Sequence, residues 1–339
     1  MLSRPLRHLP FRAGTQLTGA ALGLSLMMAP ASAQSTPQQA TTAAQASVPL
    51  ASLPDHLFSG KRSREVFATQ VMLDRARFSP GVIDGYGGGN TARAVKAYQR
   101  TNGMSPTGYV DPALLAALRG DGAEPVVKRY ALIEADLAGP FGDLPEGMEA
   151  LSKVEATHYE SAAEAIAEKF HMSQELLRAL NPDIDRAAPG DTITVAATRA
   201  VPIEATVARI EVDGRAAALR AYAADGRLLA AYPATVGSAD FPSPNGKMEV
   251  RAIAPAPAYY FSPEGRDWGP DRRLTIAPGP NNPVGSTWID LTKEGYGIHG
   301  TPDPRLIGKT PSHGCVRLTN WDAQELAKAV EKGTTVEFL

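Results

Sequence analysis

Residues 299–318 read HGTPDPRLIGKTPSHGCVRL and include Cys315, the only cysteine of the 339-residue chain. If the segment around this cysteine is extended, its side chains alternate, so His313, Cys315 and Arg317 share one face while the residues between them enter the core. An inert buried thiol is not expected beside a histidine and an arginine, and nearby positive charge favours the nucleophilic thiolate. We therefore interpret Cys315 as a nucleophile rather than as an inert side chain or an intermolecular bridge.

A nucleophilic thiol needs a base, and two histidines compete for that role. Residues i and i+2 of a strand lie roughly 6.6 Å apart, so His313 need not reach the sulfur of Cys315. His299 ends an apolar run and is followed at once by turn residues, which places it at a strand end beside the cleft. We expect His299 to be the base and His313 to support the site. A zinc site made of these two histidines and Cys315 is the alternative, but we expect no metal and no other cofactor.

Residues 203–339 have the pattern of a mostly β domain. Short alternating runs such as ATVARIEVD and KMEVRAIA are separated by turn residues, which predicts an antiparallel sheet, a sandwich or a barrel. Only NWDAQELAKAVEKG (320–333) is clearly helical, with Asn320 as the expected cap and Gly333 as the stop.

This region resembles the L,D-transpeptidase catalytic (YkuD) family. The resemblance rests on the histidine and the Ser-His-Gly-Cys segment of 299–318, together with VGSADFPSPNGKMEV (236–250) and PGPNNPVGSTWIDL (278–291). It implies a cysteine acyltransferase that attacks the bond between diaminopimelate and D-Ala in peptidoglycan tetrapeptide stems, releases D-Ala and forms a thioester. Gly300 stands where other members have serine, so either a side chain or a backbone carbonyl is left to orient His299.

The resemblance also implies roles for the residues around Cys315. His299 acts as proton donor and acceptor, and backbone amides at Gly314 and Cys315 stabilise the oxyanion. Arg317 holds a substrate carboxylate, and Ser312 joins it in substrate binding.

Two small modules are expected before the catalytic domain. Residues 57–119 carry three helical patterns and resemble the peptidoglycan-binding domain type 1 family through PGVIDG (80–85) and AVKAYQ (94–99). Residues 150–197 contain a capping box, SAAE (161–164), two helical patterns and the alternating run GDTITV, and they resemble a LysM module. Both resemblances imply binding to peptidoglycan.

The N-terminus is typical of an export signal. Basic residues precede the apolar run LTGAALGLSLMMAP (17–30), and small residues follow it at 31–33. We expect a signal peptide over 1–33 and a periplasmic protein, with a retained anchor as the weaker alternative. Residues 34–56 and 120–149 have linker compositions.

The sequence therefore predicts a multidomain α+β peptidoglycan L,D-transpeptidase with a role in cell-wall organisation and cell shape. A net charge of −2 without a basic run gives no indication of nucleic-acid binding. The acyl acceptor stays open between another diaminopimelate, a lysine of an outer-membrane protein and water, and an attack on an existing cross-link is also open. The last two would make the enzyme an L,D-carboxypeptidase or a cross-link hydrolase. A hypothesis of another class is a non-catalytic scaffold that binds the cell wall.

Overall fold

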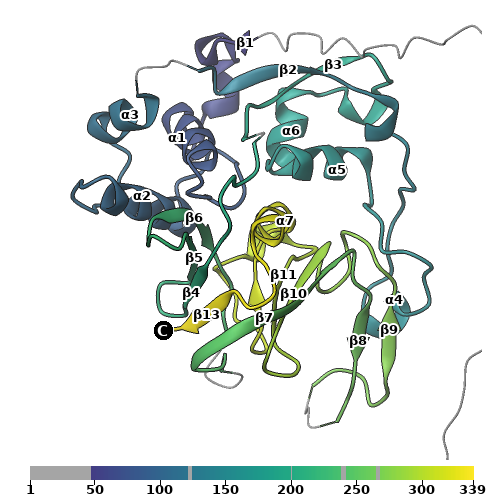
Figure 1. The fold of residues 1–339 in the computed structure, drawn as a ribbon. Coiled ribbons are helices and arrows are strands. Elements are labelled where there is room, and N and C mark those ends of the chain that lie inside the picture. Colours follow the sequence, from purple (N-terminus) through teal and green to yellow (C-terminus); the bar gives the residue numbers. More distant parts are fainter. Residues whose placement is uncertain (1–46, 121–123, 200, 238–241, 265–267) are drawn as a thin grey trace, which may run out of the picture. The chain divides into compact units, whose positions relative to one another are not determined.

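The computed structural model describes residues 47–120, 124–199, 201–237, 242–264 and 268–339. The predicted signal peptide (1–33) and most of the first predicted linker lie outside these residues. Within them, helices dominate the part before residue 200 and strands the part after it (Figure 1). This confirms the predicted mixed α+β class.

Three helices form the first module, as predicted: α1 (Arg64–Arg75), α2 (Gly89–Thr101) and α3 (Pro112–Arg119). The Ser63 hydroxyl caps α1, and the Asp111 carboxylate caps α3, which begins with a proline. Buried apolar side chains of α1 and α2 supply the core, among them Phe67, Val71, Leu73 and Val95.

The second module has the predicted order of strand, two helices and strand, but its first strand comes early. Strand β2 (Val127–Ala131) pairs antiparallel with β3 (Thr192–Ala196), and α5 (Ala162–Lys169) and α6 (Gln174–Leu180) lie between them in the chain. β2 falls in the segment expected as a linker. It forms there because Val127, together with Val126 and Leu132 at the two ends of the strand, is buried in the shared core. Strand β1 (Ser47–Val48) extends this sheet from within the first expected linker (34–56), so the described end of that segment is ordered and not a flexible linker.

Short helical turns complete this half of the described chain: η1 (Leu50–Ser52), η2 (Asp55–Phe58), η3 (Glu134–Asp136), α4 (Met148–Leu151) and η4 (Ile184–Arg186). The capping box at α5 is only half formed. Ser161 Oγ accepts from the Glu164 amide, but the Glu164 carboxylate accepts from the Glu160 amide instead of that of Ser161.

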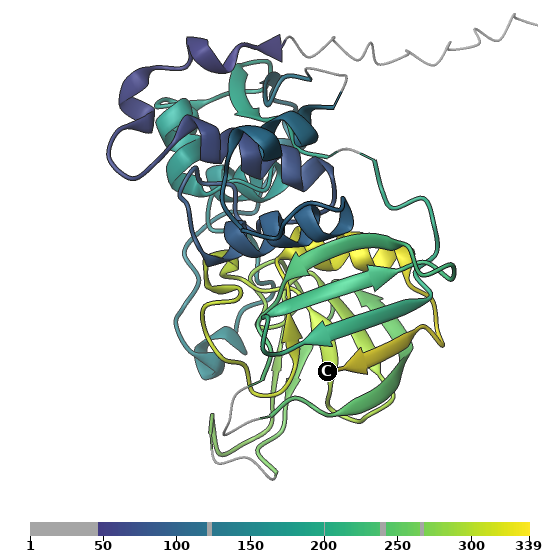
Figure 2. The same cartoon turned by 90° about the vertical axis from the view of Figure 1, so that its left-hand side faces the viewer.

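An eight-stranded sheet dominates the C-terminal part, in the order β12-β11-β10-β7-β13-β4-β5-β6. Its strands are β4 (Arg209–Asp213), β5 (Ala218–Tyr222), β6 (Leu228–Pro233), β7 (Gly246–Pro255), β10 (Thr287–Leu291), β11 (Gly297–His299), β12 (Val316–Arg317) and β13 (Thr335–Phe338). Neighbours are antiparallel except for the pairs β13–β4 and β11–β12, which are parallel. The sheet is curled, and α7 (Asn320–Ala329) packs on it (Figure 2). Strands β8 (Tyr259–Phe261) and β9 (Leu274–Ile276) form a separate hairpin, and η5 (Pro304–Leu306) lies between β11 and β12.

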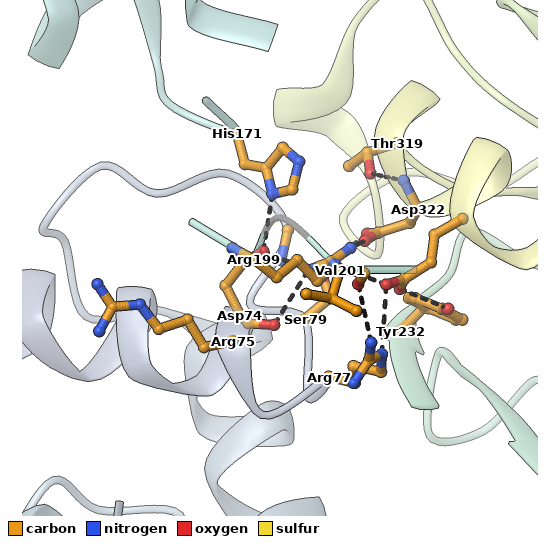
Figure 3. A network of polar contacts seen from close by, with 12 residues as sticks. Asp74, Arg75, Arg77, Ser79, His171, Arg199, Val201, Tyr232, Thr319 and Asp322 are labelled. Carbon is orange, nitrogen blue, oxygen red and sulfur yellow. Dashed lines mark hydrogen bonds and ion pairs between the residues drawn. The ribbon is translucent and has the colours of Figure 1, made fainter. Parts of the chain in front are cut away.

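A buried arginine joins the modules to α7. The side chain of Arg199 bonds Asp74 on α1 together with Asp322 and Glu325 on α7 (Figure 3). Burial would raise the pKa of Asp74, but the charges of Arg199 and His171 lower it to about 2. The carboxylate of Asp74 is therefore ionised, and Arg199 is the cation that it depends on.

Replacing Arg199 should destabilise the whole described unit. Arg199→Ala removes the ion-pair partner of Asp322 and leaves Asp74 and Glu325 with only His171 and Arg77. We therefore expect the free energy of unfolding to fall by roughly 3–5 kcal/mol. The matched control is Arg178→Ala, which removes a partly exposed ion pair with Asp185 and should cost about 1 kcal/mol or less. Urea unfolding measures both values. Equal losses of unfolding free energy in the two variants would show that the buried network stabilises the fold no more than an exposed ion pair does.

Candidate functional site

The segment around Cys315 is a turn rather than a continuous strand. Only Val316 and Arg317 form β12, and the backbone bends at 313–315. Gly314 has a φ of 109°, a conformation open to glycine and rarely to other residues. Val316 is fully buried, as predicted. Although the backbone bends, burial still alternates as expected: Gly314 and Leu318 are buried too, whereas His313 is exposed and Cys315 and Arg317 are half-buried.

Hydroxyl groups hold this turn. Ser312 Oγ donates to the Cys315 carbonyl (2.6 Å) and accepts from the Gly314 amide (3.2 Å). Ser243 Oγ donates to the Gly314 carbonyl (2.7 Å) and accepts from the Gly237 amide (2.9 Å). Ser312 is buried, so its hydroxyl acts within the turn, and its contact with a substrate stays a prediction.

Parallel pairing brings His299 to this turn. His299 of β11 stands opposite Arg317 of β12, and Ile298 stands opposite Val316, the residue after the cysteine. The cysteine is half-buried, and its Sγ lies 3.6 Å from the Gly295 carbonyl oxygen. The charge of Arg317 interacts with both Cys315 and His299. The structure thus brings together three of the predicted site residues.

His299 is held as a neutral base. Burial, and then the charge of Arg317, lower the pKa of its imidazole to about 4, while the carbonyl groups of Gly300 and Val284 act in the opposite direction. Its Nδ1 lies 2.7 Å from the Gly300 carbonyl oxygen. A carbonyl only accepts, so Nδ1 carries the proton and Nε2 keeps the lone pair. A backbone carbonyl, that of Gly300, therefore orients His299, in a position where other family members are expected to have a serine.

His313 occupies a different environment from His299. Its side chain is exposed, and its ring stacks on Trp268 with centroids 4.0 Å apart. His299 instead stacks on Trp288 at 5.4 Å. The structure thus separates the two histidines by burial, which agrees with a supporting role for His313. Among the described residues, no group of three or more His, Cys, Asp or Glu side chains is placed to hold a metal ion.

Sequence reasoning missed several residues of the site. These are Ser243, Trp268, Trp288, Tyr296 and Asn320. The ring of Tyr296 lies against Gly314, and Asn320 accepts from the Thr301 amide. The chain has three tryptophans, and two of them stack on the site histidines, so this scarcity was an available signal. Nothing in the sequence indicated the two hydrogen bonds of Ser243.

Comparisons with known proteins match two regions of the chain. Residues 208–338 match the model "L,D-transpeptidase catalytic domain", and residues 62–118 match "Putative peptidoglycan binding domain". The chain is 31% identical over 177 residues to "Putative L,D-transpeptidase YkuD" of Bacillus licheniformis, covering 52% of this chain and 92% of that protein. It is 51% identical over 57 residues to the protein of the same name from Bacillus subtilis, covering 17% and 35% of the two chains. A solved L,D-transpeptidase from Xylanimonas cellulosilytica aligns with a TM-score of 0.37 at 18% identity, covering 83% and 95%.

Titration of His299 tests the description of the neutral base. We expect its ring to gain a proton near pH 4 rather than near its ordinary value of 6.5, and Arg317→Gln should move this pKa upward. The folded ring binds a proton less readily than the unfolded one, so the stability that it contributes is lost as pH falls from about 6.5 to about 4. NMR of labelled histidine measures the pKa. A value near 6.5 in the folded protein would contradict the burial and charge described here.

Gly314 should resist substitution more strongly than a glycine in open space. A Cβ at Gly314 would lie 2.9 Å from Tyr296 Cε1, whereas a Cβ at Gly226, with a φ of 83°, would meet no atom within 4 Å. Both alanine variants carry backbone strain, but only Gly314→Ala must also displace a ring. We expect Gly314→Ala to lose about 1–2 kcal/mol more unfolding free energy than Gly226→Ala in urea. Equal losses would mean that Tyr296 does not pack against the turn.

Proposed function

The chain belongs to the L,D-transpeptidase family, and from this premise we propose that it is a peptidoglycan L,D-transpeptidase whose nucleophile is Cys315. One observation carries the proposal: the β11–β12 pair places a neutral His299 opposite Arg317, whose charge also acts on Cys315, the only thiol. Acyl transfer by a cysteine uses a thiol and a base with a free lone pair, and a nearby cation favours the thiolate.

The reaction divides into two steps. The Cys315 sulfur, having given its proton to His299, attacks the carbonyl carbon that joins diaminopimelate to D-Ala. The C–N bond breaks, the imidazolium returns the proton to the departing amine, and D-Ala leaves while a thioester remains. An amine acceptor then attacks the thioester, His299 takes its proton, and the sulfur is released. His313 supports the site from its stacked position on Trp268.

Backbone amides at Gly314 and Cys315 are the proposed oxyanion donors. The Gly314 amide donates to Ser312 Oγ, so it must exchange this partner to reach a substrate oxygen. Arg317 is the proposed partner of a substrate carboxylate, since its half-buried guanidinium lies beside the cysteine. A contact between Ser312 and substrate belongs to the same proposal.

The modules before the catalytic domain support peptidoglycan as the partner. We propose that residues 57–119 and the LysM-like residues 150–197 hold the enzyme on the cell wall, and that the signal peptide (1–33) exports it to the periplasm. No helix of the described residues is long and apolar enough to cross a membrane. The second match, over 62–118, supports the wall-binding part of this proposal.

Three acceptors fit the same acyl-enzyme. Another diaminopimelate gives a cross-link, a lysine of an outer-membrane protein gives an anchor, and water gives an L,D-carboxypeptidase. A fourth activity, a cross-link hydrolase, arises when Cys315 attacks an existing cross-link, the second stem leaves as an amine, and water resolves the thioester. Mass spectrometry of muropeptides incubated with the enzyme separates these four by their products.

Release of D-Ala from tetrapeptide muropeptides tests the proposed chemistry. We expect Cys315→Ala to abolish it, His299→Gln to lower it by roughly 100-fold or more, and His313→Gln to lower it less. A thiol-alkylating reagent should inactivate the parent protein, and a chelator should not.

Two results would contradict the proposal. Inhibition by the chelator alone would favour the zinc hydrolase. If the parent protein forms no product but still co-sediments with purified cell wall, the non-catalytic scaffold would be favoured.

A further inference from the structure

The Asn320 side chain is buried against the segment that follows His299. It was expected to cap α7, but the Thr319 hydroxyl accepts from the Asp322 amide and caps the helix instead. The Asn320 side chain is 1% exposed. Its Oδ1 accepts from the amides of Thr301 and Ser286, each at 3.1 Å. One side-chain oxygen therefore ties the segment after His299 to the segment that enters β10.

Two glycines make room for this oxygen. A Cβ at Gly300 would lie 2.2 Å from Asn320 Oδ1, and a Cβ at Gly285 would lie 2.1 Å from it. Both distances are far inside van der Waals contact, so a side chain at either position would expel Asn320. The close approach of Asn320 thus explains why a glycine follows His299.

The other end of the amide reaches another module. Asn320 Nδ2 donates to the carboxylate of Glu168 on α5, with distances of 3.1 and 3.3 Å to its two oxygens, and to the Pro280 carbonyl at 3.1 Å. Helices α5 and α7 contact each other (Figure 1). Because amides surround Oδ1 and acceptors surround Nδ2, these partners fix the orientation of the Asn320 amide.

Glu168 is suited to hold this orientation. It is buried and also accepts from the Tyr159 hydroxyl at 3.1 Å. Burial raises its pKa to about 7, with hydrogen bonds from Asn320 and Tyr159 acting against this rise and the charge of Glu164 adding to it. Neutral or ionised, Glu168 retains an oxygen that accepts from Asn320.

We propose that Asn320 is a positioning residue for His299, and that Glu168 of the LysM-like module sets its orientation. Hydrogen bonds connect the two ends: Glu168 holds Asn320, Asn320 holds the Thr301 amide, and the Gly300 carbonyl between Thr301 and His299 accepts from the histidine ring. The inference rests on the proposed function, because it assigns the second module a part in supporting the catalytic base as well as in binding the wall.

Loss of this support should disturb His299 rather than substrate binding. When Asn320 is absent, the Gly300 peptide group can rotate, and the histidine loses the acceptor that keeps its proton on Nδ1. A base displaced by about 1 Å loses up to roughly 100-fold in rate. The substrate contacts proposed for Arg317 lie on β12 and keep their strand pairing, so KM should change little.

The test uses four variants of the full chain, each with one substitution: Asn320→Ala, Glu168→Ala, Glu168→Gln and the control Glu164→Gln. Glu164 lies on the same helix and is also buried, but it bonds Asn281 and the Glu160 amide instead of Asn320. We expect Asn320→Ala to lower kcat for D-Ala release by about 10–100-fold and Glu168→Ala by a smaller factor, with KM within about threefold of the parent. Glu168→Gln should restore most of the rate that Glu168→Ala loses, and Glu164→Gln should match the parent.

A spectroscopic readout separates positioning from stability. ¹⁵N NMR of labelled histidine should show the Nδ1–H tautomer of His299 in the parent and a mixture of tautomers in Asn320→Ala, below the unfolding temperature of each variant. The double variant Asn320→Ala with Glu168→Ala should be no slower than Asn320→Ala alone, because both act through one amide.

Several outcomes would overturn the inference. Parental kcat and an unchanged His299 tautomer in Asn320→Ala would remove its basis, and equal losses in Glu168→Gln and Glu168→Ala would show that the hydrogen bond to Asn320 is not what matters. If the parent releases no D-Ala, the proposed function fails by itself. The tautomer measurement still decides whether Asn320 positions His299.

Discussion

Strand β11 pairs in parallel with β12 at the edge of the curled sheet, and the site depends on this pairing. A parallel pair needs a long connection between its strands, and here residues 300–315 supply it with only the short η5 turn inside. The pairing fixes His299 opposite Arg317 and places the turn at 313–315, which contains Cys315, directly before β12. Burial then keeps the histidine neutral, and the arginine supplies positive charge beside the thiol. Geometry and electrostatics at the site thus follow from one register.

Sequence patterns predicted the parts of the site that depend on spacing along the chain. Cys315, His299 and Arg317 were singled out from residue type and spacing, and their roles stay proposals. Val316 and Leu318 are buried as the alternation required. The turn was missed, because a positive φ at Gly314 interrupts a pattern that otherwise resembles a strand. Strand β2 was missed because its buried apolar residues, Val126, Val127 and Leu132, stand at its two ends and give no alternating pattern. The partnership of Glu168 with Asn320 joins residues 152 positions apart, which no local pattern reveals.

Buried polar contacts connect the modules that precede the catalytic sheet to one helix, α7. Arg199 reaches Asp322 and Glu325 on one part of this helix, and Glu168 reaches Asn320 at its first residue. Such groups are costly to bury unless their partners are in place, so they favour one arrangement of the chain over looser ones. Helix α7 consequently both packs on the core of the sheet and receives contacts from outside it, next to the segment that follows His299.

We propose that Cys315 carries the acyl group during the reaction. This can be tested by intact-mass measurement of the full-length protein, mixed with a tetrapeptide muropeptide and quenched at short times. We expect a covalent adduct equal to the stem without its terminal D-Ala. Peptide analysis should map this adduct to Cys315, and it should accumulate when amine acceptors are withheld. Formation of products without an adduct at Cys315, or with the adduct on another residue, would contradict this proposal.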